Sequence, residues 1–551
     1  MTTEAAGSTR ASDLLRRPWV AAVVVLAVYG ALALLNSTGG YLGTDTGAKV
    51  ITLDRMAEED TFSPAVGYWA EEWDPDGDYH PLFDTKQNAE GEWVNVTTLP
   101  MLFAARPLYE LGGYRLALML PMLGGLLAAF ACRDIARRLA GGPEGWWAFW
   151  VTALASPILV YSLDLWEHSV GAGLMLGGIA LLVRTPHVGG VVLASLVAGA
   201  LFGLAASMRA EAFVVAFVAV AVTCLALVLR RQIGRALVTG ALSVVGFALP
   251  WLANASIEQD FGGNPRTSRV SGQAQRQWWT ELAERGEEAF ITWFGLPGFG
   301  YPGNVLLGAA VVGAIVLGVT MHRRGEQRPA VAALVVAGVI YVLAFASGLG
   351  FVSGALVASP FAAVAGLVRR DRERLAILGM ALLMTVLIWT FQLTGGAGPQ
   401  WGGRYLLVPT LLLTTLGVIA LVERPGRAPR VAVSAFAVAV TLFGAAWLQQ
   451  RSHDVEAFFD DLADRPEDVV ISANGFFVRE AGPAYDERRY LSIGRGADLE
   501  GAVDVVRDAG FDTFAVLAGR GDAPDLEATL VGTDVVDFLG VPLGYHRYEL
   551  E

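Results

Sequence analysis

The sequence predicts a helical domain that crosses a membrane many times, followed by a small α/β domain. Of the 551 residues, 54% are hydrophobic and only 17% are charged, and the mean hydropathy is +0.48. A single soluble globule does not have this composition. Apolar runs of about 17 to 20 residues recur up to residue 448, and each could cross roughly 30 Å of hydrocarbon. Beyond residue 450 these long runs stop.

We count thirteen apolar runs and therefore predict about thirteen transmembrane helices in an all-α domain at residues 1–450. The runs fall near residues 18–36, 114–131, 146–162, 167–183, 188–206, 210–229, 236–254, 303–321, 329–347, 350–368, 374–393, 404–422 and 429–448.

Groups of arginines predict the orientation of these helices, because cytoplasmic loops carry an excess of basic residues. The groups occupy alternate connections, so all of them fall on one side when thirteen helices are threaded in order. This places the N-terminus in the cytoplasm, and the loop at residues 37–113 and the C-terminal block outside. The groups are Arg16-Arg17, Arg133/Arg137/Arg138, Arg184, Arg230/Arg231/Arg235, Arg323/Arg324/Arg328, Arg369/Arg370/Arg372/Arg374 and Arg424/Arg427/Arg430.

The two hydrophilic blocks of the chain are acidic. Residues 41–100 carry 13 acidic and 3 basic side chains, and residues 451–551 carry 22 and 9. The net charge of the whole chain is −13, so the remaining, membrane-embedded part is basic.

The only cysteines of the chain are Cys132 and Cys224, both within or at the ends of apolar runs, and no disulfide framework is expected. We expect no nucleic-acid partner.

The first outer loop contains two expected helices. From Lys49 onward, Val50, Leu53 and Met56 recur at helical spacing, which predicts a short amphipathic helix on the membrane surface. Thr98-Leu99-Pro100 has the chemistry of a second helix start, and Gly112-Gly113 that of its end.

The block at residues 451–551 is predicted to be a separate extracytoplasmic α/β domain. It contains no Gly-x-Gly-x-x-Gly or phosphate-loop pattern, so no nucleotide is assigned to it. The expected strands lie at residues 468–472, 490–493 and 514–517, and the expected helix lies at residues 497–509.

Asp45 is the first candidate catalytic residue, because it places a carboxylate just past the first apolar run. A carboxylate at this membrane rim can act as general base on an acceptor hydroxyl. The alternative is that Asp45 caps a helix, with Lys49 as its partner one turn later. The two roles are compatible.

Glu167, His168 and Arg209 lie between runs that are otherwise apolar. Ionisable groups so close to the membrane interior are costly, which makes them functional candidates. The alternatives are a solvated turn for the first two, and an ion pair with Glu211 that joins two helix ends for Arg209. Glu167-His168 is a weak metal signal, because a zinc site needs further, suitably spaced ligands.

The glycine-rich stretch at residues 395–406 is the most specific of the polar segments. Glycines let the backbone approach a ligand closely, and amide groups at a helix start attract anions. Arg404, flanked by Trp401 and Tyr405, can hold a phosphate through two parallel hydrogen bonds. The alternative is a plain turn with one interfacial arginine and tryptophan.

Taken together, these motifs resemble the polytopic GT-C glycosyltransferases, in particular the bacterial relatives of protein mannosyltransferases and of the lipid A aminoarabinose transferase. The shared order is an acidic residue after the first helix, another after the third, and a late Trp-Gly-x-Arg-Tyr-Leu at residues 401–406. Asp-Pro-Asp-Gly at residues 74–77 and Leu-Tyr-Glu-Leu-Gly-Gly at residues 108–113 also fit. The resemblance covers residues 18–450 in architecture.

The resemblance implies a polyprenyl-phosphate sugar donor, bound from the outer leaflet of a bacterial plasma membrane. The acceptor would be an envelope glycan, a lipid or a protein, and direct displacement would invert the anomeric configuration. Asp45 would be the base and Glu167 the second acidic residue. Arg404, with Arg209 or Lys49 assisting, would hold the phosphate.

His168, Trp401 and Tyr405 complete the expected substrate-binding set. No cofactor is identified, and a divalent metal between Asp45 and Glu167 stays open. Two other functions compete with this interpretation. One is a transporter or flippase, although no internal repeat is found and the candidate charges gather at one face. The other is an envelope polysaccharide polymerase or ligase that uses arginines of a large outer loop, with Arg266, Arg269 and Arg276 as candidates.

Overall fold

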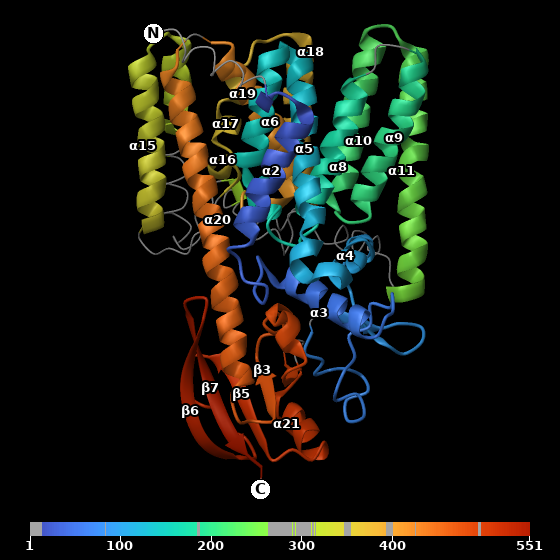
Figure 1. Cartoon of the computed structure of the whole chain (residues 1–551), viewed down its shortest axis with the longest axis vertical. Helices are drawn as coiled ribbons and strands as arrows, with labels where there is room; N and C mark the ends of the chain where they lie inside the picture. The colour runs from blue at the N-terminus through green and yellow to red at the C-terminus, as the bar shows by residue number, and fades with distance from the viewer. Residues whose placement is uncertain are drawn as a thin grey trace.

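The computed structural model describes residues 14–82, 84–184, 188–262, 316–346, 354–392, 401–424, 426–493 and 497–550, with a few single residues between 289 and 314. Helices stand side by side as a bundle, and a five-stranded sheet lies beyond one end of it (Figure 1). The predicted fold class, a helical membrane domain followed by a small α/β domain, is confirmed.

Six of the described helices are long and apolar enough to cross a membrane, judged by length and composition. They are α5 (Met119–Ala140), α10 (Glu211–Leu229), α11 (Ile233–Gly262), α18 (Arg372–Gln392), α19 (Leu407–Val422) with the preceding 3-10 turn η2 (Arg404–Leu406), and α20 (Ala428–Ala463). Shorter apolar helices are α2 (Pro18–Ala33), α8 (His168–Val183), α9 (Val188–Ala206) and α15 (Gln327–Ala346). The described residues do not establish the predicted total of thirteen.

Two apolar runs do not form the single helices that we predicted. The run at 350–368 contains the short pieces α16 (Ala355–Ala358), α17 (Pro360–Ala363) and η1 (Ala365–Leu367). The run at 146–162 divides into α6 (Gly142–Leu154) and α7 (Pro157–Tyr161). A proline opens α7 and another opens α17, and proline has no N–H to continue the helical hydrogen bonds. Most of the run at 303–321 lies outside the described residues.

The outer loop forms α3 (Thr44–Glu58), α4 (Leu99–Ala117) and a hairpin of β1 (Thr85–Gln87) and β2 (Trp93–Asn95). The start of α4 is confirmed, and Gly112 and Gly113 depart from helical geometry as expected. The surface position predicted for α3 is wrong. All residues from 46 to 53 are buried, because α3 lies between the bundle and the C-terminal domain (Figure 1).

The C-terminal domain has a sheet in the order β4-β3-β5-β7-β6. The strands β3 (Val469–Ser472), β4 (Arg489–Ser492) and β5 (Thr513–Gly519), and the helix α21 (Leu499–Asp508), confirm the predicted elements. The hairpin of β6 (Thr529–Phe538) and β7 (Val541–Glu549) was not predicted. Strand β6 is mostly exposed and therefore lacks the apolar alternation of a half-buried strand. Two 3-10 turns, η3 (Val478–Glu480) and η4 (Gly482–Tyr485), follow β3.

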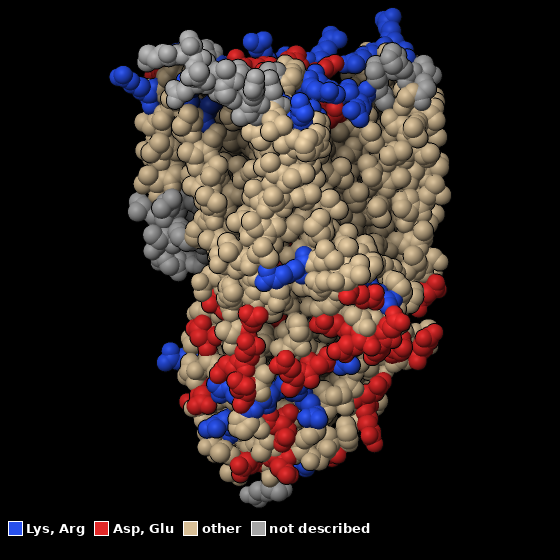
Figure 2. All heavy atoms as spheres, in the orientation of Figure 1, with Lys and Arg blue, Asp and Glu red and all other residues tan. Residues whose placement is uncertain are grey.

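Charged side chains separate to the two ends of the molecule. Basic residues gather at the end of the bundle far from the C-terminal domain, while acidic residues cover that domain and the outer loop (Figure 2). The surface between them is almost free of charge in this view. This separation is the one that the arginine groups predicted. Helix α20 runs through the apolar zone and continues past the proposed boundary at residue 450 into the C-terminal domain (Figure 1).

Candidate active site

Lys49, Glu167 and Arg209 form a buried ionic chain at the end of the bundle that faces the C-terminal domain. Lys49 Nζ lies 2.9 Å from Glu167 Oε2, and both side chains are only 2% exposed. Arg209 Nη1 lies 3.3 Å from Glu167 Oε1, and its Nε donates to Glu211 Oε1 at 2.9 Å. Three predicted site residues, from α3, from the N-cap of α8 and from the turn before α10, are thus brought together, with Glu211 added.

Arg404 lies close to this chain, and the two contact the same aromatic ring. The guanidinium carbons of Arg209 and Arg404 lie 4.9 and 4.8 Å from the centroid of the Tyr405 ring, and that of Arg404 lies 5.3 Å from the ring of Trp166. Such cation–π contacts are favourable but do not neutralise a charge. Arg404 makes no ion pair with a described residue, and its buried Nε has no hydrogen-bond partner among them.

Two glycines allow Arg404 to take this position. Gly402 and Gly403 have φ values of +66° and +67°, a backbone conformation that favours glycine. A Cβ atom on Gly402 would lie 2.4 Å from Cγ of Pro157, so the turn can sit against α7 only without a side chain. Gly402 and Gly403 of the predicted glycine-rich stretch therefore have a packing reason, while residues 395–400 of it lie outside the described residues.

Asp45 lies apart from the buried chain, on the first turn of α3. Gly43 is the N-cap residue, so Asp45 does not have the capping position that we gave as its alternative role. The backbone carbonyl of Asp45 accepts from Lys49 Nζ at 3.2 Å. Its side chain is 41% exposed, and Oδ1 lies 3.4 Å from Nη2 of Arg479 in the C-terminal domain. Sequence reasoning missed Arg479, which stands in no recognisable motif.

Asp164 is a third buried carboxylate of this region, and its partners are all neutral. Oδ1 accepts from the backbone N–H of Leu42 at 2.9 Å and from the Tyr114 hydroxyl at 3.2 Å, and Oδ2 accepts from the Thr46 hydroxyl. The side chain thereby joins the outer loop to the turn before α8. These bonds give Asp164 a structural role.

His168 and Trp401 are held by aromatic packing. The His168 ring stacks on Tyr161 at a centroid distance of 4.9 Å, and it meets the edge of Trp166 at 4.3 Å. Trp401 is 1% exposed and stacks on Trp447 of α20 at 5.6 Å. From this burial we expect Trp401 to position the turn before Arg404 rather than to bind a ligand.

The residues of this site do not fit a divalent metal. Both oxygens of Glu167 face cations, and Asp45 pairs with Arg479. Within the described ranges, no three His, Cys, Asp or Glu side chains are placed to hold a metal ion. The arginines expected in a polymerase or ligase, at positions 266, 269 and 276, lie outside the described residues.

No family model and no curated protein matches this chain. Among solved structures, it is similar to ArnT from Cupriavidus metallidurans bound to undecaprenyl phosphate, with 13% identity and a TM-score of 0.49 over 96% of this chain and 98% of the other. It is also similar to the Archaeoglobus fulgidus oligosaccharyltransferase in complex with zinc and sulfate, with 14% identity and a TM-score of 0.44 over 89% and 67%.

Both proteins are glycosyltransferases of the GT-C class that the sequence resembles. Identities of 13% and 14% transfer no residue role to this chain. The roles proposed below therefore follow from burial, charge and contacts within the site itself.

Proposed function

We propose that this protein is a membrane-embedded glycosyltransferase that moves a sugar from a polyprenyl-phosphate donor to an acceptor. The observation that carries the proposal is Arg404, a partly buried cation whose Nε is enclosed and which has no carboxylate partner in the described chain. Taking such a charge out of water is costly unless an opposite charge arrives. A phosphate on a lipid supplies that charge, and it can reach the site from the membrane.

Lys49 and Arg209 support the same phosphate from the buried ionic chain. Both are already held by Glu167, and Arg209 also by Glu211, so they could donate hydrogen bonds to a phosphate without depending on the ligand for their place. Fixed cations of this kind stabilise charge that develops on a leaving group, which is usually the largest single contribution to catalysis. Glu167 is enclosed and faces two cations, so its proposed role is to orient them.

Asp45 is the proposed general base, because its side chain is partly open to an incoming acceptor. The acceptor hydroxyl loses its proton to the Asp45 carboxylate while its oxygen bonds to the anomeric carbon. The bond from that carbon to the phosphate oxygen breaks, and polyprenyl phosphate leaves with the electron pair. One displacement of this kind inverts the anomeric configuration.

The reaction is assigned to the outer face of a bacterial plasma membrane. The separation of charge in Figure 2 supports this orientation, since basic residues mark the cytoplasmic side. The active site and the C-terminal domain would then lie outside, where soluble nucleotide sugars are not needed. The acceptor would be an envelope glycan, a lipid or a protein.

A donor panel tests the proposal. Purified protein in detergent is incubated with polyprenyl phosphates that carry different pentoses and hexoses, and release of free polyprenyl phosphate is followed by mass spectrometry. We expect release from at least one of these donors and none from the matching nucleoside-diphosphate sugars. Consumption of the nucleotide sugars alone would contradict the proposal, as would movement of intact lipid across proteoliposomes without loss of its sugar.

A further inference from the structure

We propose that the C-terminal domain completes the active site by presenting Arg479 to Asp45, so that Arg479 acts as a positioning residue for the base. This inference rests on the proposed function. It adds that the soluble domain takes part in the transfer step itself, although it has no recognisable catalytic motif.

The contact joins a buried cation to two carboxylates of the outer loop. The Arg479 side chain is 3% exposed, and its Nη2 lies 3.4 Å from Asp45 Oδ1. Its Nη1 lies 3.4 Å from Asp84 Oδ2. A guanidinium is a planar fork, so anchoring one nitrogen on Asp84 fixes the direction in which the other meets Asp45. One oxygen of Asp45 is thereby held while the side chain stays 41% exposed.

The backbone of η3 lies directly against α3, two residues after the base. A Cβ atom on Gly47 would lie 2.2 Å from the carbonyl oxygen of Arg479 and 2.9 Å from Cα of Glu480. Any larger residue at position 47 would push η3 away from α3 and draw Arg479 off Asp45. The glycine between Asp45 and Lys49 is therefore explained by the docking of the C-terminal domain.

Further contacts beside Arg479 fix the same interface. Arg451 of α20 pairs with Glu480 and also donates from Nε to the carbonyl of Leu42 at 3.1 Å. Gly482, with a φ of +55°, approaches so closely that an added Cβ would lie 2.1 Å from the Tyr41 hydroxyl. The segment that carries Arg479 is thus held by α20 and by the chain that leads into α3.

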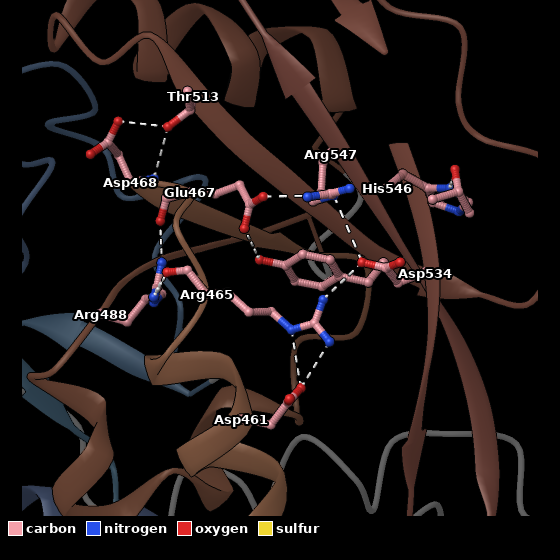
Figure 3. Close-up of polar contacts among 11 residues, drawn as sticks. Asp461, Arg465, Glu467, Asp468, Arg488, Thr513, Asp534, His546 and Arg547 are labelled. Carbon is pink, nitrogen blue, oxygen red and sulfur yellow. Dashed lines mark hydrogen bonds and ion pairs between the residues drawn. The ribbon is translucent and has the colours of Figure 1, made fainter. Parts of the chain in front are cut away.

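The domain is also held firmly on α20, which comes from the bundle. Arg465 bridges Asp461 of α20, at 3.0 Å, and Asp534 of β6, at 3.2 Å. Arg488 donates to the carbonyl of Ala463 at the end of the helix at 2.6 Å. Figure 3 shows how these side chains converge between the helix end and the sheet. The transmembrane helix therefore sets where η3 meets α3.

The chemical consequence is orientation of the base. A half-exposed carboxylate on a helix surface can take several rotamers, and only some of them face an acceptor oxygen. A displacement of about 1 Å in a reacting group can cost about 10²-fold in rate. Arg479 selects one arrangement of Asp45, and transfer then depends on the C-terminal domain being docked.

The test measures steady-state kinetics of the full-length protein with a donor found in the panel. We expect Arg479→Gln to lower kcat by about 10²-fold with little change in the donor KM, and Arg479→Lys to recover part of the loss. In an Asp45→Asn background, Arg479→Gln should cost nothing further, because residues that act as one unit are not additive.

Arg55→Gln is the matched control. Arg55 of α3 pairs with Asp486 of the C-terminal domain at the same interface, without touching Asp45, and its loss should leave kcat near that of the unmodified protein. An equal loss for Arg55→Gln would show a general docking effect and overturn the inference. So would an unchanged kcat for Arg479→Gln, or the same loss with and without Asp45.

The outcomes separate this inference from the proposed function. If the unmodified protein consumes no polyprenyl-phosphate sugar, the proposed function fails, whatever the variants do. If it is active and the Arg479 variants behave like Arg55→Gln, only the inference fails. Should Arg479→Gln not purify as a folded protein, Arg479→Lys decides: its loss of kcat must disappear in the Asp45→Asn background.

Discussion

Two regions of this protein each contain a carboxylate paired with a basic side chain. The carboxylates, Glu167 and Asp45, differ in burial. Glu167 is 2% exposed and meets Lys49 and Arg209 inside the bundle. Asp45 is 41% exposed and meets Arg479, a cation supplied by another domain. A buried, doubly paired carboxylate has no access to an acceptor, whereas a half-exposed one has. We therefore distinguish the proposed base, Asp45, from Glu167, which is proposed to orient two cations, by the exposure of the side chain rather than by residue type.

The largest effect is expected at the exposed member of the comparison. Asp45→Asn keeps the size of the side chain and removes the base, so turnover should fall by about 10² to 10⁴-fold. Donor binding should persist, because the proposed phosphate contacts lie at Arg404 and the buried ionic chain. Binding of labelled donor and the transfer rate are measured separately. Near-normal transfer would end the assignment of Asp45 as base and remove the contrast with Glu167.

Substitution of the buried carboxylate, Glu167, should lower the stability of the folded protein. Glu167→Gln leaves Lys49 and Arg209 enclosed without their shared carboxylate, and breaking such a pair costs about 3–5 kcal/mol. We expect a clear fall in the unfolding temperature in detergent, which thermal scanning fluorescence would measure. A stable variant that has lost only turnover would instead give Glu167 a direct part in the chemistry.

The donor side is tested at Arg404. Arg404→Ala removes charge-assisted hydrogen bonds worth about 1.5–3 kcal/mol, so the Kd for the donor should rise by about 10 to 10²-fold. Lys keeps the charge but not the two-pronged geometry, and should recover only part of the affinity. If Lys restores full affinity, the arginine merely extends to the membrane interface.

Asp164 is a buried carboxylate that can be compared with Glu167. Its substitution should have the smallest effect of the four. Its partners are two donors on Oδ1 and the Thr46 hydroxyl on Oδ2. In Asp164→Asn the new amide can donate to that hydroxyl, which also accepts hydrogen bonds. We expect a loss of only about 1 kcal/mol by the same thermal scan. A loss as large as that of Glu167→Gln would mean that charge matters equally at both positions.

Most residues of the candidate site could be predicted from the sequence, but not all of their contacts. Glu167, Arg209 and Arg404 stand out because ionisable groups are costly beside apolar runs, and all three lie in one neighbourhood. Lys49 stands out because it is one of only two lysines in the chain. Its partner could not be predicted, because Glu167 lies far away in the sequence, at the N-cap of α8, and helical spacing suggested Asp45 instead.

The apolar helices, the arginines gathered at one end and the first strands of the C-terminal domain could all be predicted from the sequence. These features depend on local hydrophobicity and on charge near helix ends, which can be recognised within a short window. Two features became apparent only in the folded protein: the C-terminal domain covers α3, and Arg479 contacts Asp45 across 434 positions of sequence. Contacts of that kind depend on how whole elements pack, and a close approach at Gly47 leaves no periodic pattern from which to predict it.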